Sequence, residues 1–320
     1  MLNSYLLLTR RQLLATSALG AIGLAAVGAG ALYHDTTDLK ITRLDVPLRR
    51  LPSRFDGLRI VQLSDFHYDR YVDVRIITSA VQAANQLQPD LVVLTGDFVT
   101  QGPFTGQYDP PSARDAEPCS QILSRLRSRL GIFAVLGNHD YYTDPNMVAE
   151  ILRSCGFHVL RNHSFAVEQE GSRLWIAGVN DVVAGADDLE LALQKIPASE
   201  TVVLLAHEPD FADWVPPGRV DLQLSGHSHG GQIVLPVIGP PYLPPLARKY
   251  PWGLRHLGPL TLYTNRGVGT ITLPLRFNCP PEITLFTLRS SYAAPPLPVS
   301  DRRQTAPSRG GGSHRRARAG

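Results

Sequence analysis

Residues 58–67 read LRIVQLSDFH, a mostly apolar run of strand length that stops at a carboxylate and an imidazole. We expect a buried strand over 58–63, with Asp65 and His67 just beyond its carboxyl end. In open α/β sheets such ends face the crevice in which ligands bind. Residues two apart point the same way while the chain stays extended, which would bring these two side chains together. An aspartate that caps a following helix is an equally common reason for the pattern.

The same pattern recurs after a helix. Residues 76–87 have helical periodicity, and residues 91–97, LVVLTGD, form a second apolar run that ends at Gly96 and Asp97. Because glycine has no Cβ, we expect Gly96 to let the backbone pass close to a neighbouring group. A second carboxylate therefore reaches the same edge of the predicted sheet.

A third unit follows. After a Pro-, Gly- and Ser-rich insertion over 102–118 and a predicted helix over 119–129, an apolar run over 131–136 ends in GNHD, residues 137–140. Three successive β-α units that deliver polar groups to one edge predict an α/β fold with its functional site there.

Two later runs end in the same manner. The run over 201–205 is followed by AHE, residues 206–208, and the run over 220–224 is followed by SGHSH, residues 225–229. A Gly-His-Ser-His segment on a helix would not align both imidazoles usefully. We therefore expect an extended turn in which histidines two apart serve neighbouring ions.

These five segments, in this order, resemble the signature blocks of the calcineurin-like metallophosphoesterases, and the match spans about 58–288. The resemblance implies two mixed β-sheets packed face to face with helices outside, which is a four-layer α/β/β/α sandwich. It also implies two divalent metal ions. One ion would be held by Asp65, His67 and His229, and the other by Asn138, His207 and His227, with Asp97 bridging them.

The ligand types agree with that implication. Imidazole and carboxylate groups suit Mn, Zn or Fe, and no thiolate occurs at these strand ends. Seven ligands exceed the needs of one ion, so two ions that share a carboxylate are the economical arrangement. Two such ions clamp a phosphoryl oxygen and activate water for in-line attack on a phosphodiester, phosphomonoester or pyrophosphate. No Ser or Cys nucleophile is needed.

Other polar side chains are predicted to act on the substrate. His139 occupies a position that faces the substrate in the family, so we assign it as general acid to the leaving oxygen, or as a donor that stabilises the transition state. Asp140 is expected to fix its tautomer. A structural histidine is the alternative reading. Asn265 and Arg266 follow a strand-like run over 260–264, and an arginine there would be able to bind phosphate bidentately. A solvated arginine fits the pattern equally well.

Residues 1–34 are predicted to be an export signal or a membrane anchor. TRRQLL, residues 9–14, opens a run that is uncharged to Leu32 and long enough to span a bilayer. The arginine pair resembles a twin-arginine signal, which implies an export machinery as partner. Residues 29–31, AGA, offer a cleavage site, although an uncleaved anchor fits equally well.

The orientation of this segment follows from two conflicting rules. Four basic residues follow the run and outnumber the pair before it, which favours a cytoplasm-facing domain; they are Lys40, Arg43, Arg49 and Arg50. We favour the extracytoplasmic face of the membrane, because a twin-arginine signal is read by its own receptor.

The remaining segments set the domain limits and the partners. We expect a linker and first strand over 35–57, the phosphoesterase domain over 58–290, and a disordered basic tail over 291–320. Five arginines after Arg302 account for the net charge of +3, and the segment after Arg302 has no aromatic residue, so no nucleic acid partner is expected. Three widely spaced cysteines are neither a disulfide framework nor a zinc motif.

The substrate class is suggested by three segments, SGHSHGGQI (225–233), TNRGVGT (264–270) and LPLRFNCPPEI (273–283). They resemble a bacterial branch with an N-terminal signal or anchor, which includes cell-wall-associated phosphoesterases and related enzymes that cleave UDP-2,3-diacylglucosamine in lipid A biosynthesis. The resemblance implies a substrate near a membrane, such as a lipid-linked phosphate ester. The Pro- and Leu-rich stretch 231–252 is either a membrane-facing lip or a rigid loop.

Two alternatives to that function are a cell-wall phosphodiesterase and a catalytically silent metal-binding protein at the membrane. Degenerate members of the family lose metal ligands, whereas this chain retains every ligand that the resemblance implies. An enzyme is therefore the favoured prediction.

Overall fold

The computed structural model describes residues 36–69, 73–101 and 110–290. The predicted signal (1–34), the predicted tail (291–320) and residues 102–109 of the predicted insertion lie outside the described residues. Within the described ranges, no helix has both the length and the apolar character needed to cross a bilayer.

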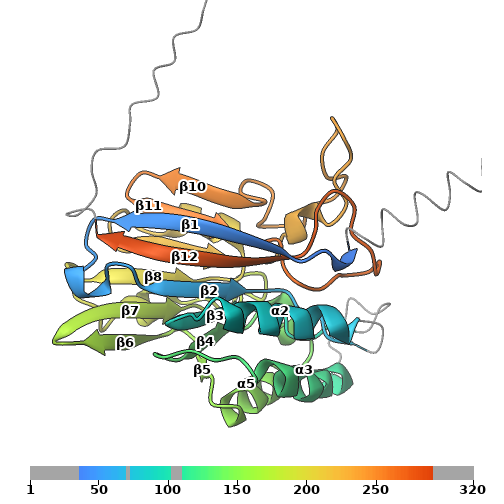
Figure 1. Cartoon of the computed structure of the whole chain (residues 1–320), viewed down its shortest axis with the longest axis horizontal. Coiled ribbons are helices and arrows are strands. Elements are labelled where there is room, and N and C mark those ends of the chain that lie inside the picture. Colours follow the sequence, from blue (N-terminus) through green and yellow to red (C-terminus); the bar gives the residue numbers. More distant parts are fainter. Residues whose placement is uncertain (1–35, 70–72, 102–109, 291–320) are drawn as a thin grey trace, which may run out of the picture.

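The first of two six-stranded sheets has the strand order β1-β12-β2-β3-β4-β5 (Figure 1). Its strands are β1 (Lys40–Leu48), β2 (Arg59–Leu63), β3 (Leu91–Thr95), β4 (Ile132–Val135), β5 (His158–Val159) and β12 (Glu282–Ser290). Strands β2 to β5 run parallel, and β12 lies antiparallel to β2. The predicted first strand is thus β1, and Pro47 is part of it; a proline is tolerated there because β1 is an edge strand.

The second sheet has the order β10-β11-β9-β8-β7-β6. Its strands are β6 (His163–Gln169), β7 (Ser172–Gly178), β8 (Thr201–Leu205), β9 (Leu222–Ser225), β10 (Gly253–Leu257) and β11 (Leu260–Thr264). The four central strands are parallel, and the two edge strands are antiparallel to their neighbours. Both sheets are therefore mixed.

The helices are short. The α-helices are α2 (Val74–Gln86), α3 (Ala116–Leu123), α4 (Asn138–Tyr142), α5 (Pro145–Ser154) and α6 (Leu189–Leu193). The 3-10 helices are η1 (Ser53–Phe55), η2 (Pro110–Asp115), η3 (Pro209–Trp214) and η4 (His229–Gly231).

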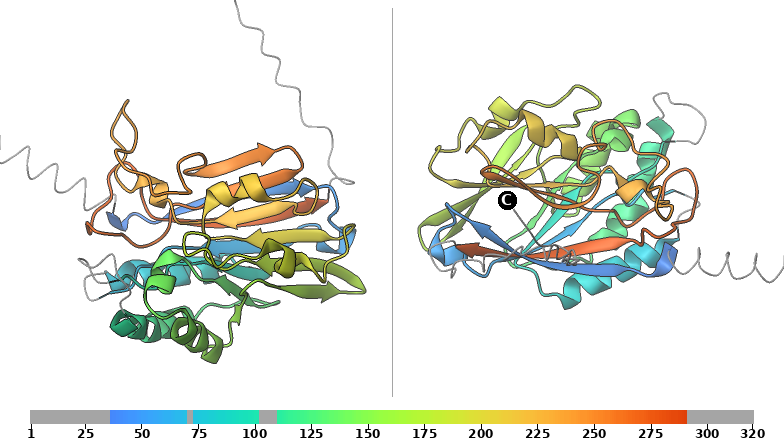
Figure 2. Two further views of the ribbon diagram at one scale, coloured as in Figure 1. Left: turned by 180° about the vertical axis from the view of Figure 1, so that it is seen from behind. Right: turned by 90° about the horizontal axis from the view of Figure 1, so that it is seen from above.

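Apolar side chains fill three spaces between four layers (Figure 2). Along β2, Ile60 points between the sheets and Val61 points to the outer face, as the two-residue period of a strand requires. Helices α2, α3 and α5 cover that outer face, and α6 with η3 covers the second sheet. The predicted α/β/β/α sandwich is confirmed.

Most predicted elements agree with the structure to within one or two residues, but the helix predicted over 119–129 does not. It is α3, which starts earlier and ends at Leu123. Its chain tightens after that point, because Arg125 and Leu126 donate to carbonyls three residues back and the Ser124 hydroxyl donates to the Gln121 carbonyl.

Candidate metal centre

Five strands from both sheets end where the predicted metal ligands lie. Asp65 and His67 follow β2, Asp97 follows β3, Asn138 follows β4, His207 follows β8, and His227 and His229 follow β9. All seven side chains are buried, none more than 7% exposed. Burial of so many polar groups at one place requires partners for each of them.

The chain makes a tight turn at most of these residues. Five of the seven have φ in the left-handed region, namely Asp65 (54°), His67 (45°), Asp97 (55°), His227 (67°) and His229 (50°). The prediction of an extended chain at Asp65–His67 and at His227–His229 is therefore wrong. Such a conformation costs a residue other than glycine roughly 1–2 kcal/mol, and strain of this kind concentrates at functional sites.

Two glycines make the close packing of the centre possible. At Gly96, which has φ of +97°, an added Cβ would lie 2.6 Å from His207 Nδ1. At Gly137 an added Cβ would lie 2.6 Å from His207 Nε2 and would overlap Asp97 Oδ1. The predicted close approach at Gly96 is confirmed.

The ligand atoms form two adjacent sets. The atoms of Asp65, His67 and His229 lie within 4.8 Å of one another, and so do those of Asp97, His207 and His227. Asp97 stands between the sets, because its Oδ2 lies 3.1 Å from His207 Nε2 and 3.4 Å from His67 Nε2. This is the geometry expected of a carboxylate shared by two ions.

Hydrogen bonds to the far side of three imidazoles orient these rings. His207 Nδ1 lies 2.6 Å from the Thr95 carbonyl, to which it donates, and His227 Nε2 donates to the Pro245 carbonyl at 2.8 Å. His67 Nδ1 lies 3.2 Å from the Thr100 hydroxyl. Each ring therefore turns its other nitrogen toward the centre, as metal-binding histidines do.

Unpaired acceptors show that a cation fits between these groups. Asn138 Oδ1 and His207 Nε2 are buried without a hydrogen-bond partner. Because His207 donates through Nδ1, its Nε2 faces Asp97 Oδ2 across 3.1 Å, and these two atoms need a proton or a cation between them. Leaving a buried acceptor unsatisfied costs about 1–3 kcal/mol, and a cation between the two atoms removes that cost. The nitrogen and oxygen donors present fit two divalent ions of the Mn, Zn or Fe kind.

The pKa values divide the histidines into two kinds. Burial lowers the pKa of His67 to about 3 and lowers the pKa of His227 and His229, so these rings are neutral and can bind a metal ion. At His207 burial is outweighed by the Asp97 carboxylate, which raises the pKa of the imidazole well above its usual value. Burial raises the pKa of Asp65 to about 7. In the metal-free protein His207 is therefore protonated, and this proton supplies positive charge beside Asp97.

Comparison with known proteins places the chain in a family. The calcineurin-like phosphoesterase model matches residues 58–231. The metallophosphoesterase YkuE of Bacillus subtilis, described as uncharacterized, is 35% identical over 291 residues, which cover 89% of this chain and 99% of the relative. This chain belongs to the calcineurin-like phosphoesterases. It is accordingly a metal-dependent hydrolase of phosphoric esters, from a family that uses a dinuclear metal centre.

Two other relatives of this calcineurin-like phosphoesterase carry more specific names. Phosphodiesterase YaeI of Escherichia coli K12 is 34% identical and covers 72% of this chain and 82% of its own length. A zebrafish (Danio rerio) protein named transmembrane protein with metallophosphoesterase domain is 31% identical, over 83% of this chain and 61% of the relative.

In this phosphoesterase His139 lies beside both ligand sets. Its ring centroid is 4.8 Å from that of His67, edge to face, and its backbone N–H donates to Asp97 Oδ1 at 2.9 Å. Its Nδ1 is buried without a partner. Burial lowers the pKa of His139, so the ring is neutral and carries one N–H.

The prediction that Asp140 fixes the tautomer of His139 is wrong. Both Asp140 carboxylate oxygens accept backbone N–H groups instead, at 2.9–3.3 Å; the donors are Asp97, Phe98, Val99 and Gly137. Asp140 thus ties the turn after β3 to the start of α4, and it positions Asp97 instead of acting on the substrate.

The predicted substrate contact of Asn265 is opposed by hydrogen bonds that its side chain makes within the fold. Asn265 is fully buried, its amide donates to the Thr284 hydroxyl, and its carbonyl accepts from the Gly267 N–H at 2.7 Å. Arg266 pairs through Nε with Glu282 at 3.2 Å, so this edge of the guanidinium is already occupied. A phosphate contact by Arg266 stays a prediction.

Arg276, a fully buried arginine behind His229, was not predicted from the sequence as part of the site. Its guanidinium lies 3.5 Å from His229 Nδ1. It donates to five backbone carbonyls, those of His229, Arg266, Gly267, Gly269 and Cys279. Its only sequence signal is a single charge within the apolar run LPLRFNCPP.

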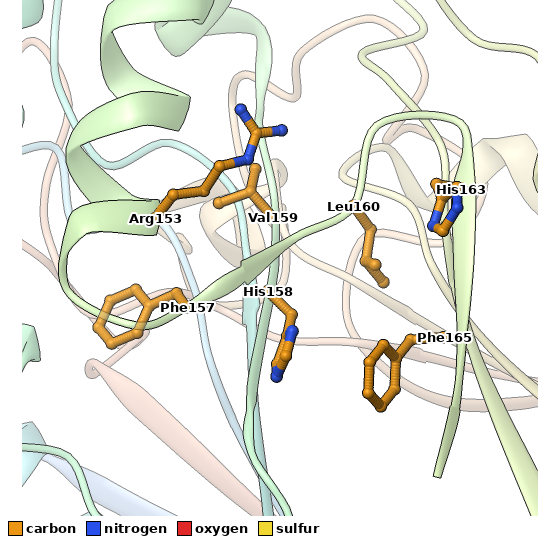
Figure 3. Close-up of a pocket in the computed structure, with 7 residues that line it drawn as sticks. All are labelled: Arg153, Phe157, His158, Val159, Leu160, His163 and Phe165. Carbon is orange, nitrogen blue, oxygen red and sulfur yellow. The ribbon is translucent and has the colours of Figure 1, made fainter.

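A surface pocket lies away from the centre. The pocket has a volume of about 300 Å³. Figure 3 shows the residues that line it, which are Arg153, Phe157, His158, Val159, Leu160, His163 and Phe165. None of these residues is a predicted ligand, and His158 and His163 are exposed. The candidate site is therefore the buried cluster and not this pocket.

Proposed function

We propose that this phosphoesterase cleaves a phosphodiester, phosphomonoester or pyrophosphate with two divalent ions, Mn, Zn or Fe. One ion would be held by Asp65, His67 and His229, and the other by Asn138, His207 and His227, with Asp97 shared. The observation that carries the proposal is the approach of the buried His207 Nε2 to Asp97 Oδ2, at 3.1 Å. Two bound ions supply positive charge to a phosphoryl oxygen and lower the pKa of a water.

The side chains around the ions prepare the reaction. Asp140 holds the backbone that presents Asp97, and the Thr95 and Pro245 carbonyls hold His207 and His227 in the binding tautomers. We assign His139 as hydrogen-bond donor to the leaving oxygen. The neutral ring is the relevant form, because burial lowers its pKa.

We further propose that the substrate is a lipid-linked phosphate ester met at a membrane. Support comes from the uncharged run that ends at Leu32 and from the name of the zebrafish relative, a transmembrane protein. The arginine pair in residues 9–14 favours export and the extracytoplasmic face. UDP-2,3-diacylglucosamine and cell-wall phosphodiesters are specific members of the class to test.

Metal analysis of the purified chain, followed by assays with bis-p-nitrophenyl phosphate, p-nitrophenyl phosphate and UDP-2,3-diacylglucosamine, tests the proposal. We expect about two ions per chain and metal-dependent hydrolysis of at least one ester. A protein that binds both ions and stays inert on every ester would instead be a silent metal-binding protein.

A further inference from the structure

Exposed apolar side chains gather on two loops that flank the metal centre. Residues 232–247 and 267–275 contain no charged residue. They nevertheless carry the three most exposed large hydrophobic side chains of the described residues, Val237 (108%), Ile238 (78%) and Tyr242 (67%), and also Leu273 (49%). We call these four residues the apolar rim. Water solvates such a surface poorly, and clustered exposed apolar groups mark interaction sites.

The two loops form one hydrogen-bonded unit. The Gln232 amide exchanges hydrogen bonds with the backbone of Ile271 and donates to the Leu273 carbonyl, all at 2.8–3.0 Å. Paired hydrogen bonds between Leu235 and Gly239 close the tip below Val237. Val237 itself has φ of 69°, an unfavourable conformation for a β-branched residue. The tip is thus held in a fixed shape that points an unpacked apolar side chain outward.

The same unit is fixed to the metal centre. The Pro245 carbonyl accepts the hydrogen bond of His227 Nε2 at 2.8 Å. On the other loop, Cys279 Sγ donates to the His229 carbonyl at 3.2 Å, three residues after Arg276. A surface that contacts the apolar rim therefore has a fixed place relative to the ligands.

The amino-terminal end of the described chain lies against the second loop. The Arg276 N–H donates to the Thr36 hydroxyl at 2.8 Å. Figures 1 and 2 show the start of the coloured chain at the same end of the molecule as both loops. The uncharged run ends at Leu32. Thr36, which is held beside the second loop, follows Leu32 by four residues, and four residues span at most about 14 Å.

We propose that the apolar rim inserts into the interface of a lipid bilayer, beside the point at which the chain's own apolar segment enters it. Uncharged loops with exposed aliphatic side chains and one tyrosine are suited to the boundary between headgroups and acyl chains. The metal centre is then held at the headgroup level. That the substrate is lipid-linked is part of the proposed function, whereas insertion of the rim does not depend on that function.

Tryptophan quenching in the full-length protein tests insertion. Ile238→Trp is reconstituted into phosphatidylethanolamine and phosphatidylglycerol vesicles with plain or brominated acyl chains. Leu191→Trp is the matched control, because Leu191 is 52% exposed on α6, which covers the second sheet. We expect brominated lipid to quench the added fluorescence of Ile238→Trp and to leave that of Leu191→Trp unchanged. Adding Val237→Asp to Ile238→Trp should reduce the quenching.

Equal fluorescence of Ile238→Trp in both vesicles would overturn the proposal. If the rim is covered by a second copy of the chain, that result will come with a dimer in detergent that Val237→Asp weakens. Hydrolysis of soluble bis-p-nitrophenyl phosphate by the same samples separates the two claims. Activity without quenching rejects insertion, and quenching without activity rejects the proposed function alone.

Discussion

The two ligand sets of the centre differ in their surroundings. The set of His207 and His227 is oriented by two backbone carbonyls, and it has the buried carboxylate of Glu208 next to it. The set of His67 and His229 is oriented by a hydroxyl and lies against the buried guanidinium of Arg276. Positive charge nearby opposes a cation, and negative charge favours it. We infer that the His207 set binds its ion more tightly.

Removal of the shared carboxylate should weaken metal binding at both sets. Asp97→Asn keeps the shape and an acceptor for the His139 N–H but removes the charge between the sets. We expect loss of at least one ion and a fall in kcat of about 1,000-fold or more, since several kcal/mol of transition-state stabilisation depend on the ions. Metal content and kinetics measure this. Asp213→Asn, on the surface, is the control, and full activity of Asp97→Asn would contradict a bridging role.

His139→Ala should separate chemistry from metal binding. Both sets remain complete in this variant, so we expect two bound ions and a kcat lower by roughly 100-fold, the usual scale for a positioned proton donor. Steady-state kinetics beside metal analysis checks the result. A parallel loss of metal would show that His139 is a ligand, which its distance to His67 and Asp97 permits.

Arg276→Lys should affect one set only. Lysine keeps the positive charge but cannot donate to several carbonyls in a plane, so the turn at His229 loosens. We expect about tenfold weaker binding of the ion of the His67 set, with the ion of the His207 set unchanged. Two-step metal titration by calorimetry resolves the sets. Equal weakening of both steps would mean that Arg276 acts on the whole fold.

Metal binding should release protons from one group in each set. Asp97 raises the pKa of His207 against the effect of burial, and burial raises the pKa of Asp65 to about 7, so both groups hold protons in the metal-free protein near neutral pH. Ions displace these protons, so affinity falls as pH decreases, by at most about tenfold per proton and pH unit. Calorimetry in two buffers of different ionisation enthalpy counts the protons. A heat independent of the buffer would contradict the assignment.

The strands and the ligand positions were predictable because their signal is local. Each buried run stops at a polar group, and the end of a parallel strand sets the place of that group. LVVLT before Asp97 is an example, since every residue of β3 is buried and Asp97 comes two residues after the strand ends.

The errors concern contacts that only the tertiary structure makes. Asp140 accepts hydrogen bonds from the turn after β3, more than forty positions earlier in the chain. The Asn265 amide donates to the hydroxyl of Thr284 in β12. The left-handed turns at Asp65 and His67 depend on backbone hydrogen bonds to Gly96 and Asp97. None of these partners is visible in a local pattern.

The central claim is that two ions share Asp97. Electron paramagnetic resonance of the chelator-stripped chain, titrated with Mn, tests it most directly, because two Mn ions joined by one carboxylate are exchange-coupled. We predict an uncoupled spectrum at the first equivalent, from the His207 set, and a coupled pair at the second. A spectrum that stays uncoupled at saturation, or saturation at a single ion, would contradict the account.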